Sequence, residues 1–469
     1  MVWTLFLNEW RATLRDGRGL LVLAIGAVLA IASTWTTSST LERERMAQED
    51  ATYAARSAWN ERALDNPHSR AHYGDYVFRP PGPLAELDPG VQSQTGRVVY
   101  TEAHRQNSAV HKPQQESSSL LRYDRLEPAT VLQLLAPLVM VLAGFGVVSS
   151  ERESGRLRLL WIQGVRPLPL LLAKSLALWS LGVLVCLIVV GVHLAFSGPV
   201  ETGRTGAFIG LHLLVLWIVA ALVTCVSAQS RRPGTAAALL LSLWVMGAIV
   251  LPRVAAMSAN AIDPLPGRDA FQAAMQEDRE QGMDGHNPQD ARRLAFEKQV
   301  LEEYGVETAE ELPINLGGLV MQADEEYGSQ VWDKHFGELT EHLLRQSDFA
   351  GYFSFLNPLQ AADRVSMAVA GTDLHSHLEF LRQVEDYRRA LVKRLNDEHA
   401  FGGSKTGQPA RVASREFYES FRAFEFEPLP VGTLLSKSKM AIASLVLWLI
   451  GSLAYLVVSA RRMSRGGLL

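Results

Sequence analysis

The chain has 469 residues, 48% of them hydrophobic, a net charge of −4 and a mean hydropathy of +0.05. A net charge so close to zero gives no indication of nucleic-acid binding, and the two cysteines lie in apolar blocks, which excludes a disulfide framework. Almost uncharged blocks alternate with strongly polar ones, a pattern typical of a membrane protein with water-exposed domains.

The first residues, 1–18, predict an amphipathic helix that lies in the plane of the lipid headgroups. Its apolar face carries Trp3, Phe6, Trp10 and Leu14, and its polar face carries Thr4, Asn8, Arg11 and Arg15.

Six apolar stretches then follow, each compatible with the roughly 20 residues that a membrane-spanning helix needs. They are 19–38, 129–149, 175–196, 206–228, 235–252 and 440–460. The first is longer than the apolar part of a signal peptide, so we interpret it as a span. The fifth is short, and we expect it to end near Pro252.

The orientation of the spans follows from the basic residues in the short connecting segments, because such residues favour the cytoplasmic side. With six spans, all four basic segments fall on one side, so we predict cytoplasmic N- and C-termini. Two large segments, 39–128 and 253–439, then lie outside. The basic residues are Arg11, Arg15, Arg18, Arg152, Arg156, Arg158, Arg166, Arg231, Arg232, Arg461, Arg462 and Arg465.

The outer segments are predicted to be mainly helical. Leucines between Leu374 and Leu395 recur at helical spacing after the capping sequence 371–373, and a similar pattern over 291–304 stops at Gly305. Residues 41–64 contain no helix breaker, so the helix of the first span is expected to continue outward. The fold class is therefore an all-α membrane protein with a large, mainly helical domain outside the cytoplasm.

A charged strip, "SSERESGRLRLLWIQGVRP", separates the second and third spans. Within the cytoplasmic segment 150–174, we expect its leucines to lie against the membrane or the helix bundle. Gly155 permits a tight bend. The charged side chains are expected to face a soluble partner; they are Glu151, Arg152, Glu153, Arg156 and Arg158.

Extended to "SSERESGRLRLLWIQGVRPLPLLLAKSLA", this strip resembles the coupling segment of exporter-type ABC permeases of the type-two class. The six-span layout and the amphipathic start are similar to that class too. The resemblance implies a subunit of the bacterial inner membrane that pairs with a second copy or a sister permease. It also implies two cytosolic ATPase subunits docked on the strip, which power export or extrusion of a substrate.

Two other functions stay open. "FLNPLQAADRVSMAVAGTDLHSHLEFLRQVEDYRRALVKRLN" resembles a subfamily with large periplasmic domains, whose relatives include a permease that serves copper-enzyme maturation. The alternative is therefore a mechanotransmitting subunit that drives a periplasmic partner without moving substrate. A receptor with a sensory outer domain ranks lowest, since the C-terminal tail 461–469 is too short for a signalling domain.

We assign no catalytic, cofactor or metal site. "FGGSKTG" lacks the P-loop pattern, so ATP and Mg²⁺ are expected on the partner ATPase and the chain is not expected to be an enzyme. His68 and His72 could share a helix face, but Pro67 and the loop-like surroundings favour ordinary surface histidines, as for His104 and His111. The aromatic run 417–426 is expected to pack the outer domain on the membrane surface, with contact to an apolar cargo as the alternative.

Overall fold

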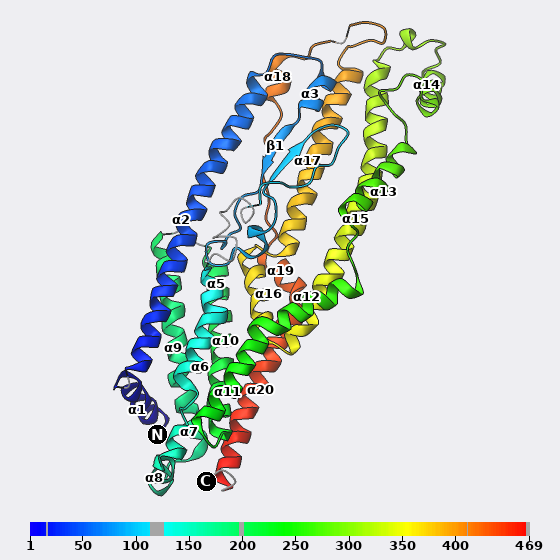
Figure 1. Cartoon of the computed structure of the whole chain (residues 1–469). Coiled ribbons are helices and arrows are strands. Elements are labelled where there is room, and N and C mark those ends of the chain that lie inside the picture. The colour runs from blue at the N-terminus through cyan, green and yellow to red at the C-terminus, as the bar shows by residue number, and fades with distance from the viewer. Residues whose placement is uncertain (16, 113–125, 197–200, 410, 466–469) are drawn as a thin grey trace.

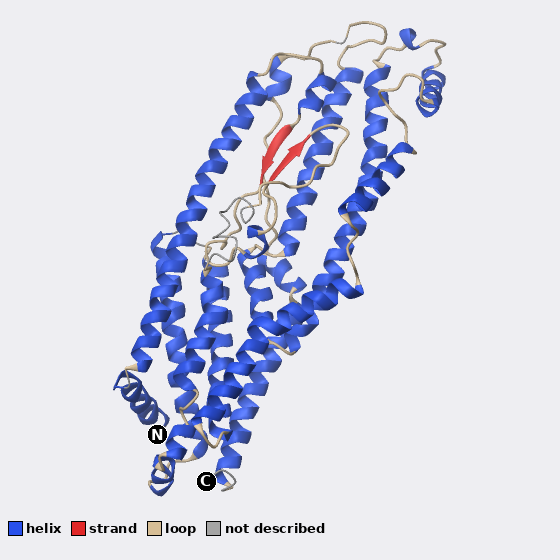
Figure 2. Ribbon diagram, viewed as in Figure 1, coloured by secondary structure: helices blue, strands red, loops and turns tan. Residues whose placement is uncertain are grey.

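The computed structural model describes residues 1–15, 17–112, 126–196, 201–409 and 411–465. Parts of the predicted loop after the third span and of the C-terminal tail lie outside these ranges. The molecule is long and almost entirely helical, with one small two-stranded sheet among the described residues (Figure 2). At one end lie α1 (Val2–Arg15), α8 (Arg156–Ile162) and the end of α20 (Lys439–Ser464), and at the other lie α3 (Pro67–Tyr73), α14 (Ala291–Tyr304) and α18 (Arg415–Glu419) (Figure 1).

Within the part of the chain that the structure describes, five helices are long and apolar enough to cross a membrane. They are the α5–α7 stretch (Pro128–Glu153), α9 (Pro167–Phe196), α10 (Thr202–Gln229), the α11–α12 stretch (Pro233–Ile262) and α20 (Lys439–Ser464). The protein is therefore an all-α membrane protein. The first predicted span falls within α2 (Arg18–Glu61) and is not among these five, so the six-span count stays a prediction.

Two of these helices contain a π-helical turn next to a proline. α5 (Pro128–Thr130) and α6 (Ala136–Gly144) flank a π turn at Val131–Leu135, and α11 (Pro233–Val245) and α12 (Leu251–Ile262) flank another at Met246–Val250. A proline lacks the N–H that a helix requires, and in membrane helices a local π turn is one of the adjustments that give the freed backbone groups new partners.

The second π turn corrects the expectation that the fifth span ends at Pro252. In a π turn each N–H bonds the carbonyl five residues earlier, so Pro252 leaves the Gly247 carbonyl without its donor. The Asn357 side chain supplies it, with 2.7 Å between Nδ2 and the Gly247 oxygen. The helix therefore continues to Ile262.

The helix α2 has 44 residues, Arg18–Glu61. It starts beside the bundle of apolar helices and runs to the far end of the part of the molecule formed by the predicted outer segments, 39–128 and 253–439, which we call the outer domain (Figure 1). At about 1.5 Å per residue it is roughly 66 Å long. This confirms the expected outward continuation of the first helix. Trp59 anchors its far end, because the Trp59 ring is buried and its Nε1 donates to the Tyr418 carbonyl at 3.0 Å.

The rest of the outer domain is built on two long helices, α15 (Leu316–Tyr352) and α17 (Leu374–Phe401), which pack side by side. The predicted cap of α17 is confirmed: the Asp373 side chain accepts from the Ser376 N–H at 3.1 Å. Smaller elements surround this pair: α3 (Pro67–Tyr73), β1 (Asp75–Phe78), β2 (Val98–Thr101), α13 (Arg268–Glu280), α14 (Ala291–Tyr304), α16 (Pro358–Ala370), α18 (Arg415–Glu419) and α19 (Val431–Lys437). The prediction for 291–304 is confirmed by α14, which Gly305 ends in the left-handed conformation.

The aromatic run before α20 packs inside the outer domain and not on the membrane surface. Tyr418 and Phe421 are buried against Trp59 near the far end of α2, and Phe424 and Phe426 pack on Phe380. The expected packing on the membrane surface is thus wrong, because these rings fill gaps between α2, α17 and the hairpin β1–β2, which lies next to them.

Candidate functional site

The charged strip folds into two short helices, α7 (Ser149–Glu153) and α8 (Arg156–Ile162), which together with Ser154 and Gly155 we call the knob. The bend between them depends on Gly155, whose φ of +74° lies in the left-handed region that favours glycine. Gly164, with φ of +79°, follows α8, and α9 begins at Pro167. The helix that contains the third predicted span, residues 175–196, thus starts eight residues earlier than that span.

One buried lysine ties the knob to the bundle. Lys174 lies on α9 with no exposed side-chain surface, and its ammonium is 2.9 Å from Glu151 Oε1 and 2.5 Å from Glu9 Oε1. Glu9 belongs to α1 (Val2–Arg15) and Glu151 to α7. The amine therefore joins three helices through two charge-assisted contacts, which are stronger than neutral hydrogen bonds.

A second attachment joins the knob to α10. The Arg152 guanidinium donates to the carbonyls of Ser230 and Ala228, at 2.5 and 2.6 Å. These carbonyls lie at the C-terminal end of α10, where helix carbonyls lack intrahelical donors and a cation is favoured by the helix dipole. The Ser227 hydroxyl adds to this joint, accepting from the N–H groups of Val148 and Ser149 at 3.0 and 3.2 Å.

These contacts correct one expectation from the sequence. Glu151 and Arg152 were expected to face a soluble partner, but both side chains bind within the chain. The sequence alone could not show that Glu151 and Arg152 bind within the chain, because nothing in it marks Lys174, just before the predicted span 175–196, as a partner of Glu151.

The remaining knob surface is exposed. Glu153, Gly155, Arg156 and Arg158 are all exposed, while Leu157 is buried under α8. Two large apolar side chains, Leu159 and Ile162, are also exposed. Charged and apolar groups side by side on a protruding element form a surface suited to a protein partner.

The helix α1 lies along α9 near the knob. Trp3 and Phe6 stack with 5.1 Å between ring centroids, and Trp3 is largely exposed. Trp10 instead faces the bundle, where its Nε1 donates to Ser180 Oγ at 2.9 Å. The residues of the predicted apolar face of α1 therefore have different surroundings. Trp3 is available to lipid, whereas Trp10 holds α1 against α9.

The outer domain brings together histidines that are far apart in the sequence. His68 and His72, on α3, meet His104 and His286. Pro67 does not disrupt this helix, because proline is well accommodated as its first residue. Burial lowers the pKa of His68 to about 3 and lowers the pKa values of His72 and His286 below their usual range, which favours the neutral form of these three rings. The sequence interpretation missed His286 altogether.

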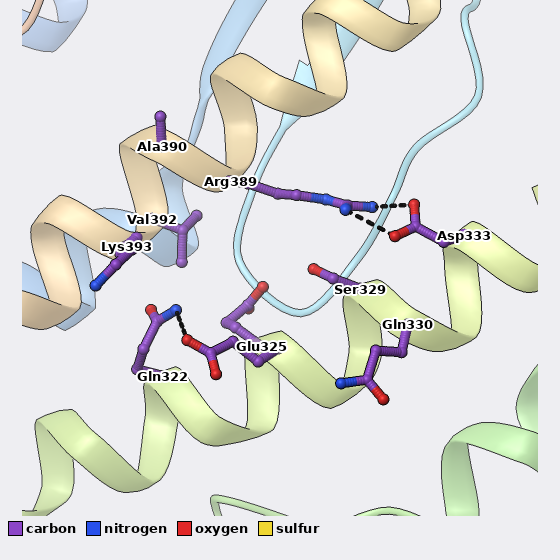
Figure 3. A pocket seen from close by; sticks show the side chains of 10 residues that line it. Gln322, Glu325, Ser329, Gln330, Asp333, Arg389, Ala390, Val392 and Lys393 are labelled. Carbon is purple, nitrogen blue, oxygen red and sulfur yellow. Dashed lines mark hydrogen bonds and ion pairs between the residues drawn. The ribbon is translucent and has the colours of Figure 1, made fainter.

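A polar cavity of about 410 Å³ lies between α15 and α17. Figure 3 shows Arg389 reaching across it from α17 to Asp333 on α15, with 2.6 Å from Nη2 to Oδ1. Gln322 on the same wall donates to Glu326 at 3.0 Å. These charged and amide groups already have partners, so we assign no ligand to this cavity.

Comparison with protein families gives two matches. Residues 98–271 match the family described as ABC-2 family transporter protein, and residues 268–427 match a domain of unknown function, DUF3526. The first match covers the knob and the helices from α5 to α12, and the second covers most of the outer domain. A comparison with curated proteins found no match.

The matches and the fold define a class: a multi-pass membrane subunit of an ABC transporter. Within that class, the match over residues 98–271 supports an ABC-2 type permease, as the resemblance of the charged strip implied, and the match over residues 268–427 fits a large additional domain. The family implies partnership with ATPase subunits.

Proposed function

We propose that separate cytosolic ATPase subunits, two per transporter, dock on the knob and drive this permease to export or extrude a substrate across the bacterial inner membrane. The proposal includes the orientation predicted from the basic segments, with the knob and both chain termini in the cytoplasm. In support, α1, the knob and the end of α20 lie at the same end of the molecule (Figure 1).

The attachment of the knob carries the proposal. Lys174 fixes α7 to α1 and α9, and Arg152 fixes α7 to the end of α10. An ATPase that moves the knob would therefore move three helices together with the α5–α7 stretch. The exposed Glu153, Arg156 and Arg158, beside Leu159 and Ile162, would supply the docking contacts.

A second permease copy, or a sister permease, completes the proposed transporter. In the most apolar segment of the α11–α12 stretch, only 17% is buried inside the molecule. The corresponding share is 50–56% for the α5–α7 stretch, α9 and α10. Its exposed side chains include Leu239, Leu243, Met246 and Ile249. An apolar helix that its own chain covers so little is available both to lipid and to a partner permease.

Mechanotransmission is the second candidate, and α2 is the observation that favours it. This uninterrupted helix of 44 residues connects the bundle to the far end of the outer domain. Movement of the bundle would reach the outer domain through α2 and could act on a periplasmic protein without any substrate crossing.

Charge reversal in the knob tests the docking proposal. Glu153→Arg should weaken capture of the ATPase, because reversing one member of an interfacial charge pair typically costs a few kcal/mol. Co-purification from membranes and substrate-coupled ATPase activity measure the effect. Arg461→Glu, which reverses an exposed charge on α20 at the same end of the molecule, is the matched control. Normal capture and coupling in Glu153→Arg would refute the docking role.

A helix break in α2 separates the two candidate functions. Met46→Pro places a proline in the middle of this helix, where it removes a hydrogen bond and bends the chain. If the protein exports substrate through the bundle, transport in reconstituted vesicles should largely persist. If it transmits movement to a periplasmic protein, ATPase capture should persist while the periplasmic effect is lost.

A further inference from the structure

Four histidines from three separate segments converge in the outer domain. His68 and His72 lie one turn apart on α3, His104 follows β2, and His286 precedes α14. One ring nitrogen of each lies within 4.8 Å of those of the other three. The three segments that carry these histidines meet only in the folded domain.

The rings have the spacing of a tetrahedral metal site. All six ring-centroid separations fall between 4.7 and 5.7 Å, and four points with nearly equal separations form a tetrahedron. A metal about 2.0–2.1 Å from each nitrogen would place the centroids roughly 5 Å apart. The Nε2 atoms of His68 and His72 are 3.1 Å apart, close to the roughly 3.3 Å between two ligands of such a site.

Polar side chains behind the His68 and His104 rings orient these rings toward the centre of the four-histidine cluster. His68 Nδ1 is 3.0 Å from the Asn396 Oδ1 oxygen, an acceptor, so the proton lies on Nδ1 and Nε2 carries the lone pair. His104 Nδ1 lies 3.1 Å from Asp324 and 3.0 Å from Glu325. Both ring nitrogens of His104 are buried, and neither makes a hydrogen bond among the described residues, so the Nδ1 contacts are charge contacts at short distance. A carboxylate behind a histidine is the usual outer shell of a metal-bound imidazole.

The backbone segments that carry His104 and His286 are also held in place. His104 has φ of +61°, a conformation that is uncommon for a residue other than glycine and that concentrates at functional sites. The Ala103 N–H donates to the Ala71 carbonyl at 3.0 Å, which attaches this turn to α3. Arg293 Nη1 donates to the Gly285 carbonyl at 2.8 Å and so holds the segment before His286.

We propose that His68, His72, His104 and His286 bind one divalent ion of the zinc and copper class. Imidazole suits Zn²⁺, Cu²⁺ and Ni²⁺, whereas Mg²⁺ and Ca²⁺ prefer oxygen ligands. The ion joins the first outer segment, which carries His68, His72 and His104, to the second, which carries His286. It therefore stiffens the far part of the outer domain. This inference does not depend on the proposed transport function.

Metal binding by the full chain in detergent tests the proposal. After removal of bound metal by a chelator, isothermal titration with Zn²⁺ at pH 7 should give one ion per chain, and Mg²⁺ should give none. His72→Gln and His286→Gln should each weaken Zn²⁺ binding by at least tenfold; both residues are exposed, so these variants are expected to fold. His111→Gln, a histidine of the same segment outside the cluster, is the control and should bind like the wild type.

A spectroscopic measurement keeps the test independent of folding. Co²⁺ takes the same tetrahedral geometry as Zn²⁺, so the wild type should show the strong visible absorption of a tetrahedral site, and His286→Gln should not. Equal Zn²⁺ affinity in the wild type and both cluster variants would overturn the proposal. A wild-type protein that binds Zn²⁺ without the Co²⁺ signal would overturn the four-histidine geometry.

Discussion

Replacing Lys174 with methionine removes the cation that joins the knob to α1 and α9. Its ammonium lies 2.5 Å from Glu9 and 2.9 Å from Glu151. With an effective dielectric of about 20, a pair at 2.9 Å gains roughly 6 kcal/mol of attraction, and the desolvation of the buried amine offsets much of it. Removing one partner of a buried ion pair typically costs about 3–5 kcal/mol.

Lys174→Met should therefore destabilise the bundle near the knob, because two carboxylates then face each other without a cation. We expect a thermal unfolding temperature lower by several degrees in detergent, and ATPase activity that no longer responds to substrate. Glu9→Gln/Lys174→Met removes one of the two charges and should recover part of the lost stability. Wild-type stability in Lys174→Met, with no gain in the double variant, would refute the reasoning.

Three further predictions concern orientation, pH and the outer domain. A thiol reagent that cannot cross the membrane should label Ala273→Cys in intact cells but not Ser464→Cys, and labelling of the latter would contradict the six-span topology. Burial and nearby Asp363 raise the pKa of Asp88 to about 7, so its contribution to stability is present below about pH 4 and is lost as the pH rises through 7. The unfolding temperature should thus fall less between pH 5.5 and 8 in Asp88→Asn than in the wild type. Phe380→Ala should lower the stability of the outer domain by about 3–5 kcal/mol, measured by denaturant unfolding, because Phe380 is fully buried between the hairpin and the aromatic run.

The membrane helices and the long outer helices could be predicted because their signals are local. Apolar runs of sufficient length, the spacing of leucines on α17, Asp373 as its cap and Gly305 after α14 each act within a few residues. The bend at Gly155 was predictable for the same reason. The continuation of α12 beyond Pro252 was not, because the donor that compensates for the proline comes from Asn357.

The parts of the site that escaped prediction depend on contacts between distant segments. Glu151 is turned inward by Lys174 on α9, which also contacts Glu9 on α1. His286 lies in a loop with no local signal, and it becomes informative only when folding brings it to His68 and His104. Pattern and spacing locate helices, but they do not show which side chains meet across them.

Cross-linking from the knob tests the central claim most directly. Ser154 lies in the exposed bend between α7 and α8. In the assembled transporter, Ser154→Cys treated with a short thiol–amine cross-linker should give an adduct with the ATPase subunit, and Ala273→Cys in the outer domain should give none. A complex that retains its ATPase yet gives no adduct at Ser154→Cys would contradict docking on the knob.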